Sequence, residues 1–148
     1  MVDLEKVRSL VPQDHGLAVV VTQRADGSAQ TSVVNAGVLD HPVSGEPVVG
    51  LVAQGGSVKL AHLRRRPRAS LVFRAGWDWV AVEGAADLAG PDDELAGFAW
   101  DADGPALLRA VFAAAGGTHD DWDEYDRVMR DERRTAVLVQ AERITSNG

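Results

Sequence analysis

The residues best suited to chemistry lie in one short stretch, where two glycines are followed by a serine and a lysine. Gly55 and Gly56 predict a tight turn, and Ser57 is a residue type that caps a helix by accepting a hydrogen bond from a free backbone N–H. Lys59 falls in the first helical turn, where its charge opposes the helix dipole and so does not serve helix stability. Free N–H groups, a close backbone approach and one ammonium suit a phosphate or a carboxylate. The stretch predicts an anion site; the alternative is a strand–turn–helix connection with a solvated lysine.

Two tryptophans and one amide give weaker signals. Trp77 and Trp79 lie two positions apart in a predicted strand, so both rings point to one face. Such a pair is typical of a core or dimer contact, or of a flat platform for an aromatic ligand. Asn35 is a polar residue on an otherwise apolar strand face, where it can orient a ring, cap a turn or meet solvent.

Composition excludes several other classes of protein. The chain has 148 residues and a formal net charge of −7, which disfavours nucleic-acid binding because that draws on a basic surface. No cysteine is present, which excludes disulfides, thiolate metal sites and cysteine nucleophiles and is in keeping with the cytoplasmic location that we expect. No apolar run reaches the roughly 18 residues of a membrane span, so no membrane partner is expected. The length predicts a single domain over residues 1–148.

Common catalytic and metal motifs are absent from the sequence. There is no G-x-G-x-x-G turn after a strand, no Walker A pattern and no G-x-S-x-G elbow. The four histidines, His15, His41, His62 and His119, include no pair spaced i, i+4, and only His119 is followed directly by two acidic residues. We therefore expect no metal site.

The elements that position these residues follow from hydrophobic periodicity and turn signals. Strands are expected at about 17–22, 29–39, 48–53, 68–74, 77–88 and 135–144, with a D-G turn joining the first two as a hairpin. Helices are expected at 3–10, between Ser57 and Pro67, from Pro105 to 115, and after a Thr118 cap. Gly84 indicates a bulge or a close backbone approach. Since most of the strands follow one another by tight turns, we predict a mainly β protein, a closed or nearly closed antiparallel barrel with peripheral helices.

Two runs resemble the signature of the flavin/deazaflavin oxidoreductase split-barrel proteins, which are similar in fold to pyridoxamine 5′-phosphate oxidase. One is L-R-R-R-P-R at 63–68, and the other is the G-W-D-W run that leads from Gly76 to Gly84. The segment 117–125 and the arginines at 133 and 134 resemble the subgroup that uses the deazaflavin cofactor F-420. The resemblance covers about residues 15–145. It implies a six-stranded antiparallel split β-barrel, which forms a homodimer with two cofactor sites at the subunit interface.

The resemblance also implies which residues bind the cofactor. Lys59 matches the lysine that binds the phosphate, and the turn beside it contributes Gln54, Ser57 and Val58. The positions near the ring system are Asn35, Val52 and Ala53. The aromatic positions that the partner subunit contributes are Trp77 and Trp79. Three arginines lie further along the same helix, Arg64, Arg65 and Arg66, and some of them are expected to reach the charged tail of F-420.

The activity implied by the resemblance is hydride transfer between the deazaflavin ring and a small organic substrate. Because the reactive carbon belongs to the cofactor, no catalytic residue is assigned, and a proton can come from water or from Tyr125. Two alternatives stay open, namely an FMN-dependent oxidoreductase of the same fold and a non-catalytic dimer that binds the cofactor.

Overall fold

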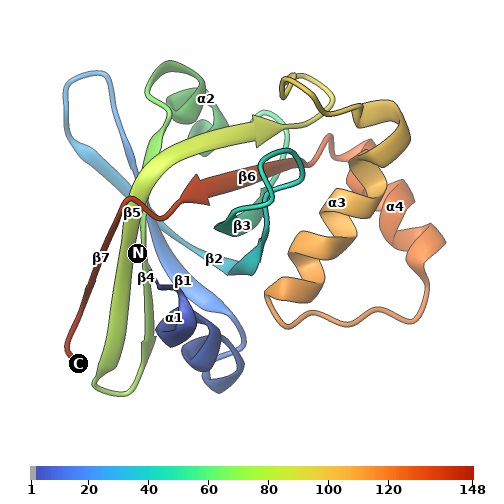
Figure 1. The fold of residues 1–148 in the computed structure, drawn as a ribbon. Coiled ribbons are helices and arrows are strands. Elements are labelled where there is room, and N and C mark those ends of the chain that lie inside the picture. Colours follow the sequence, from blue (N-terminus) through green and yellow to red (C-terminus); the bar gives the residue numbers. More distant parts are fainter. Residues whose placement is uncertain (1–2) are drawn as a thin grey trace.

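Seven antiparallel strands form the body of the molecule (Figure 1). The computed structural model describes residues 3–148, and its strands are β1 Leu17–Gln23, β2 Ala29–Asp40, β3 Pro47–Ala53, β4 Arg68–Ala75, β5 Asp78–Ala89, β6 Thr135–Gln140 and β7 Arg143–Ser146. Hydrogen bonds join them in the order β4-β1-β2-β3-β6-β5-β7, and a further pairing of β5 with β4 closes the first six into a barrel. The mainly β, six-stranded antiparallel split barrel expected from the sequence is confirmed.

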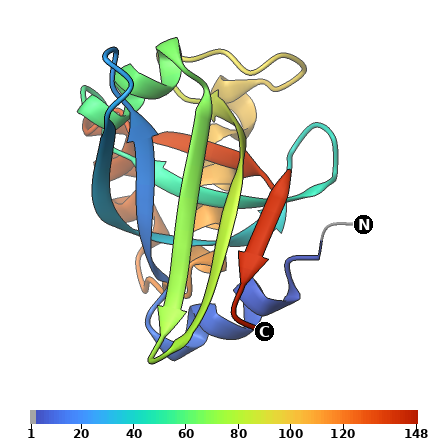
Figure 2. The same cartoon turned by 90° about the vertical axis from the view of Figure 1, so that its left-hand side faces the viewer.

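The helices lie around the barrel. They are α1 Glu5–Leu10, α2 Val58–Arg65, α3 Trp100–Ala114 and α4 Trp122–Asp131. Helices α3 and α4 sit together on one side of the barrel, whereas α2 lies at one end (Figure 1). The opposite side, where β1, β4 and β5 face the viewer in Figure 2, is not covered by any helix of residues 3–148. Within residues 3–148, none of the helices combines the length and the apolar character needed to cross a membrane.

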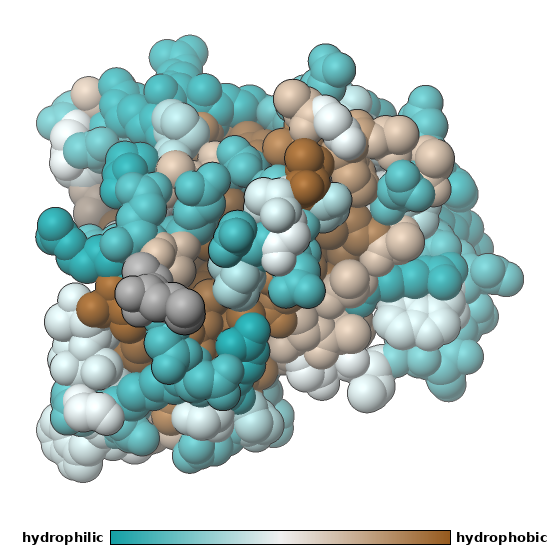
Figure 3. Space-filling model, viewed as in Figure 1, coloured by the Kyte–Doolittle hydropathy of each residue, from teal (hydrophilic) through white to brown (hydrophobic). Residues whose placement is uncertain are grey.

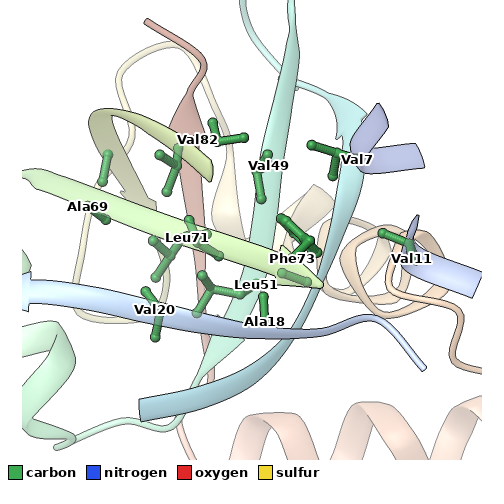
Figure 4. Close-up of a cluster of buried hydrophobic side chains, with 14 of the residues drawn as sticks. Val7, Val11, Ala18, Val20, Val49, Leu51, Ala69, Leu71, Phe73 and Val82 are labelled. Carbon is green, nitrogen blue, oxygen red and sulfur yellow. The ribbon is translucent and has the colours of Figure 1, made fainter. Parts of the chain in front are cut away.

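The interior of the barrel is filled by alternate residues of its strands. Ala18 and Val20 of β1 point inward beside Leu71 and Phe73 of β4, and each is at most 3% exposed. Figure 4 shows these side chains converging with Leu51 of β3. A second buried cluster lies between the barrel and the helical pair, and its members include Val48, Leu107, Leu108 and Leu138. Strands β3 and β6 separate the two clusters, which explains why they are apolar on both faces.

Gly84 makes the close backbone approach that the sequence predicts. A Cβ atom at this position would lie 1.8 Å from the backbone oxygen of Gln140. At this contact the continuous strand expected at 135–144 is interrupted, because the N–H of Glu142 donates to the oxygen of Glu83 at 3.0 Å. Strand β6 therefore pairs with the second half of β5 and β7 with its first half, so the prediction of one long last strand was wrong.

Two predicted helix starts were also wrong. Helix α3 begins at Trp100 and contains Pro105, because the indole of Trp100 packs over Gly104, where a Cβ atom would lie 2.7 Å from the ring. Helix α4 is capped by Asp121 rather than Thr118, since the Asp121 carboxylate accepts a hydrogen bond from the N–H of Glu124 at 3.1 Å. In the first case the position of the helix start depends on the contact between the Trp100 ring and Gly104. In the second case two nearby polar residues could both cap the helix, and the sequence alone did not distinguish them.

Candidate functional site

A cavity of about 630 Å³ lies between the barrel and the helical pair. This volume is within the range of sites for small molecules and cofactors. Its walls come from β2, the end of β3, the start of α2, the end of α3 and the inner side of α4. The lining includes six residues that the sequence assigned to a cofactor site, Asn35, Val52, Ala53, Gln54, Ser57 and Lys59. In the space-filling view, most exposed residues are hydrophilic and apolar ones show through near the middle (Figure 3).

The turn before α2 has the form that an anion site requires. Gly56 adopts a φ of +79°, and the N–H of Ser57 donates to the oxygen of Gln54 at 3.2 Å. Ser57 caps α2 as predicted, because its Oγ accepts from the N–H of Leu60 at 3.3 Å. Its hydroxyl proton remains available for a ligand, and the earlier N–H groups of the first turn have no helical acceptor.

The same turn packs directly on the connection between α4 and β6. The N–H of Gly55 donates to the oxygen of Glu132 at 3.0 Å. A Cβ atom on Gly55 would lie 2.7 Å from the backbone oxygen of Arg133. This close approach explains why position 55 is a glycine. It also brings Arg134 to the edge of the cavity.

Among the residues that the structure describes, two cations line the cavity, Lys59 and Arg134. Burial lowers the pKa of the half-buried Lys59 ammonium, and the nearby charge of Arg134 lowers it further. Arg134 donates from Nε to Glu132 Oε1 at 2.8 Å. Over residues 3–148, no carboxylate comes within 4.0 Å of the Lys59 ammonium. Two like charges that face one cavity favour a bound anion, which would relieve their repulsion.

Arg134 was not assigned to the site from the sequence, and the arginines expected near the tail of the cofactor lie outside the cavity lining. None of Arg64, Arg65 and Arg66 lines the cavity. Arg64 instead forms a two-point ion pair with Asp93, at 2.8 and 2.7 Å. The prediction that some of these arginines reach the tail of a bound cofactor is not tested by the lining of the cavity and stays a prediction. Arg134 reaches the cavity because Thr135 pairs with Ala53, which sets the start of β6 beside the end of β3.

Asn35 and Tyr125 line the cavity but use their hydrogen-bond donors within the protein. The Asn35 amide donates to the backbone oxygen of His15 at 2.8 Å, which leaves its own oxygen as an acceptor. The Tyr125 hydroxyl donates to the oxygen of Leu108 at 3.1 Å, and burial raises the pKa of Tyr125 to about 12. Of the two proton sources left open by the sequence, this geometry favours water.

Three of the predicted site residues do not line this cavity. Val58 is exposed on the first turn of α2. Trp77 lies in the turn that precedes β5 rather than on the strand, and it is 94% exposed. Trp79 is half-buried on the outer face of β5. Neither tryptophan contacts the cavity of its own chain, and whether a partner subunit supplies them remains a prediction.

The lowered pKa of Lys59 predicts how anion binding depends on pH. The ammonium attracts an anion only while it is protonated, so affinity for a phosphate-bearing ligand should fall as the pH rises through the lowered pKa of Lys59. A bound anion favours the protonated form, so binding at alkaline pH should take up a proton. Titrations between about pH 7 and about pH 10, below the ordinary lysine pKa of about 10.4, measure this. A dissociation constant that does not change over this range would contradict the role of Lys59.

A closed six-stranded antiparallel barrel with a cavity of this kind at its side defines a split-barrel protein. The chain belongs to the pyridoxamine 5′-phosphate oxidase family, whose model matches residues 4–147. This finding agrees with the resemblance seen in the sequence.

Solved structures with the same fold have low sequence identity to this chain. A conserved hypothetical protein from Mycobacterium tuberculosis is 20% identical with a TM-score of 0.69, and the match covers 99% of this chain and 84% of that one. An FMN-binding protein related to pyridoxamine 5′-phosphate oxidase, from Nostoc punctiforme, is 12% identical with a TM-score of 0.61, covering 95% and 78%. An F-420 reductase is 13% identical with a TM-score of 0.61, covering 93% and 94%. At these identities the likeness shows the fold alone.

Proposed function

We propose that this protein is a reductase that transfers a hydride between the deazaflavin F-420 and a small organic substrate. The observation that carries the proposal is that the lining of one cavity combines cations with apolar side chains. The cations are Lys59 and Arg134, beside the capped turn at Ser57. Val52 and Ala53 of β3 supply part of the apolar lining, and the end of α3 supplies more. A ligand with an anionic linker and a flat ring matches this combination.

The residues present fit such a cofactor. Lys59, Arg134 and the Ser57 hydroxyl would hold its phosphodiester, and charge-assisted bonds of this kind are stronger than neutral ones. Val52 and Ala53 would lie against the ring, and the free oxygen of Asn35 would accept from a ring N–H. When bound, the deazaflavin ring supplies the carbon that gives or accepts the hydride. The chain itself binds and orients the two reactants and limits the access of water.

FMN is the second candidate, because its single phosphate can also bind at Lys59. A fold neighbour is an FMN-binding protein, and another is an F-420 reductase. Our preference for F-420 rests on the resemblance of segment 117–125 to the deazaflavin subgroup and on the second cation at Arg134. The negative charge of F-420 extends further from the ring than that of FMN, so a second cation contributes more to it.

Titration of the purified protein with both cofactors tests the assignment. We expect F-420 to bind more tightly than FMN, and its binding to weaken more steeply with added salt because more exposed charge is screened. A turnover assay with reduced F-420 then separates a reductase from a non-catalytic binding protein. FMN retained through purification, together with no measurable binding of F-420, would overturn the proposal in favour of an FMN enzyme.

We also propose that the protein forms a homodimer through the outer face of its barrel. Val33, Val19, Val72 and Ala81 are cross-strand neighbours in a row over four strands. None of the helices in the described part of the chain covers this face in Figure 2, and Val33 is 65% exposed. Val33 also lines the cavity, so a second copy packed on this row would lie beside the cofactor. The exposed Trp77 is the aromatic residue most available for such a contact.

Light scattering should therefore show a dimer at micromolar concentration. Val19→Asp places a charge in the middle of the row and should shift the protein towards monomer, because burial of an unpaired charge is costly. Val43→Asp, which changes a valine that is 48% exposed in the β2–β3 loop, is the matched control and should stay dimeric. A monomeric wild-type protein would contradict the proposed interface.

A further inference from the structure

Two adjacent aspartates bind the two segments that carry the cations of the cavity. Asp93 pairs with Arg64, which lies on the same helix as Lys59. Asp92 pairs with Arg133, the residue immediately before Arg134. One short segment, 90–93, therefore holds both α2 and the connection between α4 and β6.

Both ion pairs have a geometry that restrains the segments they join. Arg64 donates from Nε and Nη2 to the two oxygens of Asp93, at 2.8 and 2.7 Å, and the Asp93 side chain is only 11% exposed. Arg133 likewise binds both oxygens of Asp92, with its Nε at 2.9 Å. Two parallel hydrogen bonds fix orientation as well as distance.

Segment 90–93 is itself anchored to the barrel. Gly90 and Asp93 form an isolated antiparallel bridge, with hydrogen bonds of 2.9 and 3.3 Å. A Cβ atom on Gly90 would lie 2.3 Å from Oγ1 of Thr135, which is buried at the start of β6. The two carboxylates thus project from a support that is held against the strand that follows Arg134.

Arg133 adopts a backbone conformation that arginine disfavours. Its φ is +50°, in the left-handed region, at the position after a helix end where glycine is usual. The N–H groups of Arg133 and Arg134 close α4 by donating to Arg130 and Met129, at 3.1 and 2.9 Å. This turn leads Arg134 to the cavity, and the pair with Asp92 gives a reason for arginine rather than glycine here.

We propose that Asp92 and Asp93 are positioning residues for the anion site, which they serve by holding the segments of Arg134 and Lys59 in place. This inference rests on the proposed function, since it requires that the cavity binds an anion. A positioning role and a purely electrostatic role predict opposite changes in anion affinity when a carboxylate is removed. Removal of a carboxylate near two cations should strengthen anion binding if only charge matters, whereas loss of position should weaken it.

The test uses the full chain with Asp92→Asn and Asp93→Asn, titrated with F-420 and with the same deazaflavin lacking its phosphate and tail. Each substitution should raise the dissociation constant of F-420 by about fivefold to tenfold, and change that of the phosphate-free ligand by less than about twofold. Asp93→Glu keeps the charge and should recover part of the affinity. Glu142→Gln removes a carboxylate that pairs with Arg68 at 3.2 Å, outside the lining of the cavity, and serves as the matched control.

The outcomes distinguish a positioning role of the two aspartates from a role in folding only and from no role in binding. Equal weakening for both ligands would show a role in folding only, and unchanged or tighter F-420 binding would show that position is unimportant; either result overturns the inference. If Asp93→Asn does not fold, the more exposed pair of Asp92 with Arg133 decides the matter through Asp92→Asn. A wild-type protein with no preference for the phosphate-bearing ligand would instead refute the proposed anion site, and the positioning role with it.

Discussion

Replacement of Lys59 by alanine should raise the dissociation constant of F-420 roughly 10- to 150-fold. A charge-assisted hydrogen bond contributes on the order of 1.5–3 kcal/mol, which corresponds to this range. The lowered pKa of Lys59 shows that the fold already disfavours its charged form, chiefly through burial. The substitution should therefore leave the free energy of unfolding little changed, or slightly increased, and act mainly on binding.

Fluorescence titration of the variant measures this effect. Arg127→Ala is the control, because it removes one positive charge from an exposed position of α4 that does not line the cavity. It should alter the dissociation constant only slightly, through long-range charge that salt screens. A Lys59→Ala protein that gave the wild-type titration curve would exclude Lys59 as the phosphate ligand.

Replacement of Leu51 by alanine should cost the fold about 2–5 kcal/mol of unfolding free energy, the range found for leucine-to-alanine changes in cores. Leu51 is fully buried in β3 and pairs with Ala36 on one side and Val137 on the other. It lies in the part of the barrel core shown in Figure 4. The next residues of the strand, Val52 and Ala53, line the cavity, so the loss of packing should also loosen that wall.

Denaturant unfolding of the variant, followed by titration with F-420, separates the two consequences. Val43→Ala, at a position that is 48% exposed, is the control and should change stability by less than about 0.5 kcal/mol. A Leu51→Ala protein as stable as this control would mean that β3 does not cross the core as described.

The sequence predicted the elements well where local signals determine them. The D-G turn joins β1 and β2 as expected, and the Ser57 cap and the Gly84 contact are both present. These features depend on turn chemistry, on one hydroxyl and on a missing Cβ, each of which is visible in a few neighbouring residues. The antiparallel barrel could be predicted because strands joined by tight turns pair antiparallel.

The parts of the site that the sequence did not predict depend on strand register. Arg134 faces the cavity only because Thr135 pairs with Ala53, a contact between residues far apart in the chain. The ion pair of Arg64 with Asp93 was missed for a similar reason, since β4 and β5 separate the two residues in the sequence. No local pattern of residue types encodes such pairings. The second cation of the site and the aspartate that occupies Arg64 therefore appeared only in three dimensions.

We propose that the cavity holds the phosphate of a deazaflavin cofactor between Lys59 and Arg134. A crystal structure of the protein with F-420 tests it most directly. We predict that the phosphate lies within hydrogen-bonding distance of the Lys59 ammonium and the Arg134 guanidinium, with the ring against Val52 and Ala53. A phosphate bound elsewhere, with Lys59 and Arg134 in contact only with solvent, would contradict this assignment of the anion site.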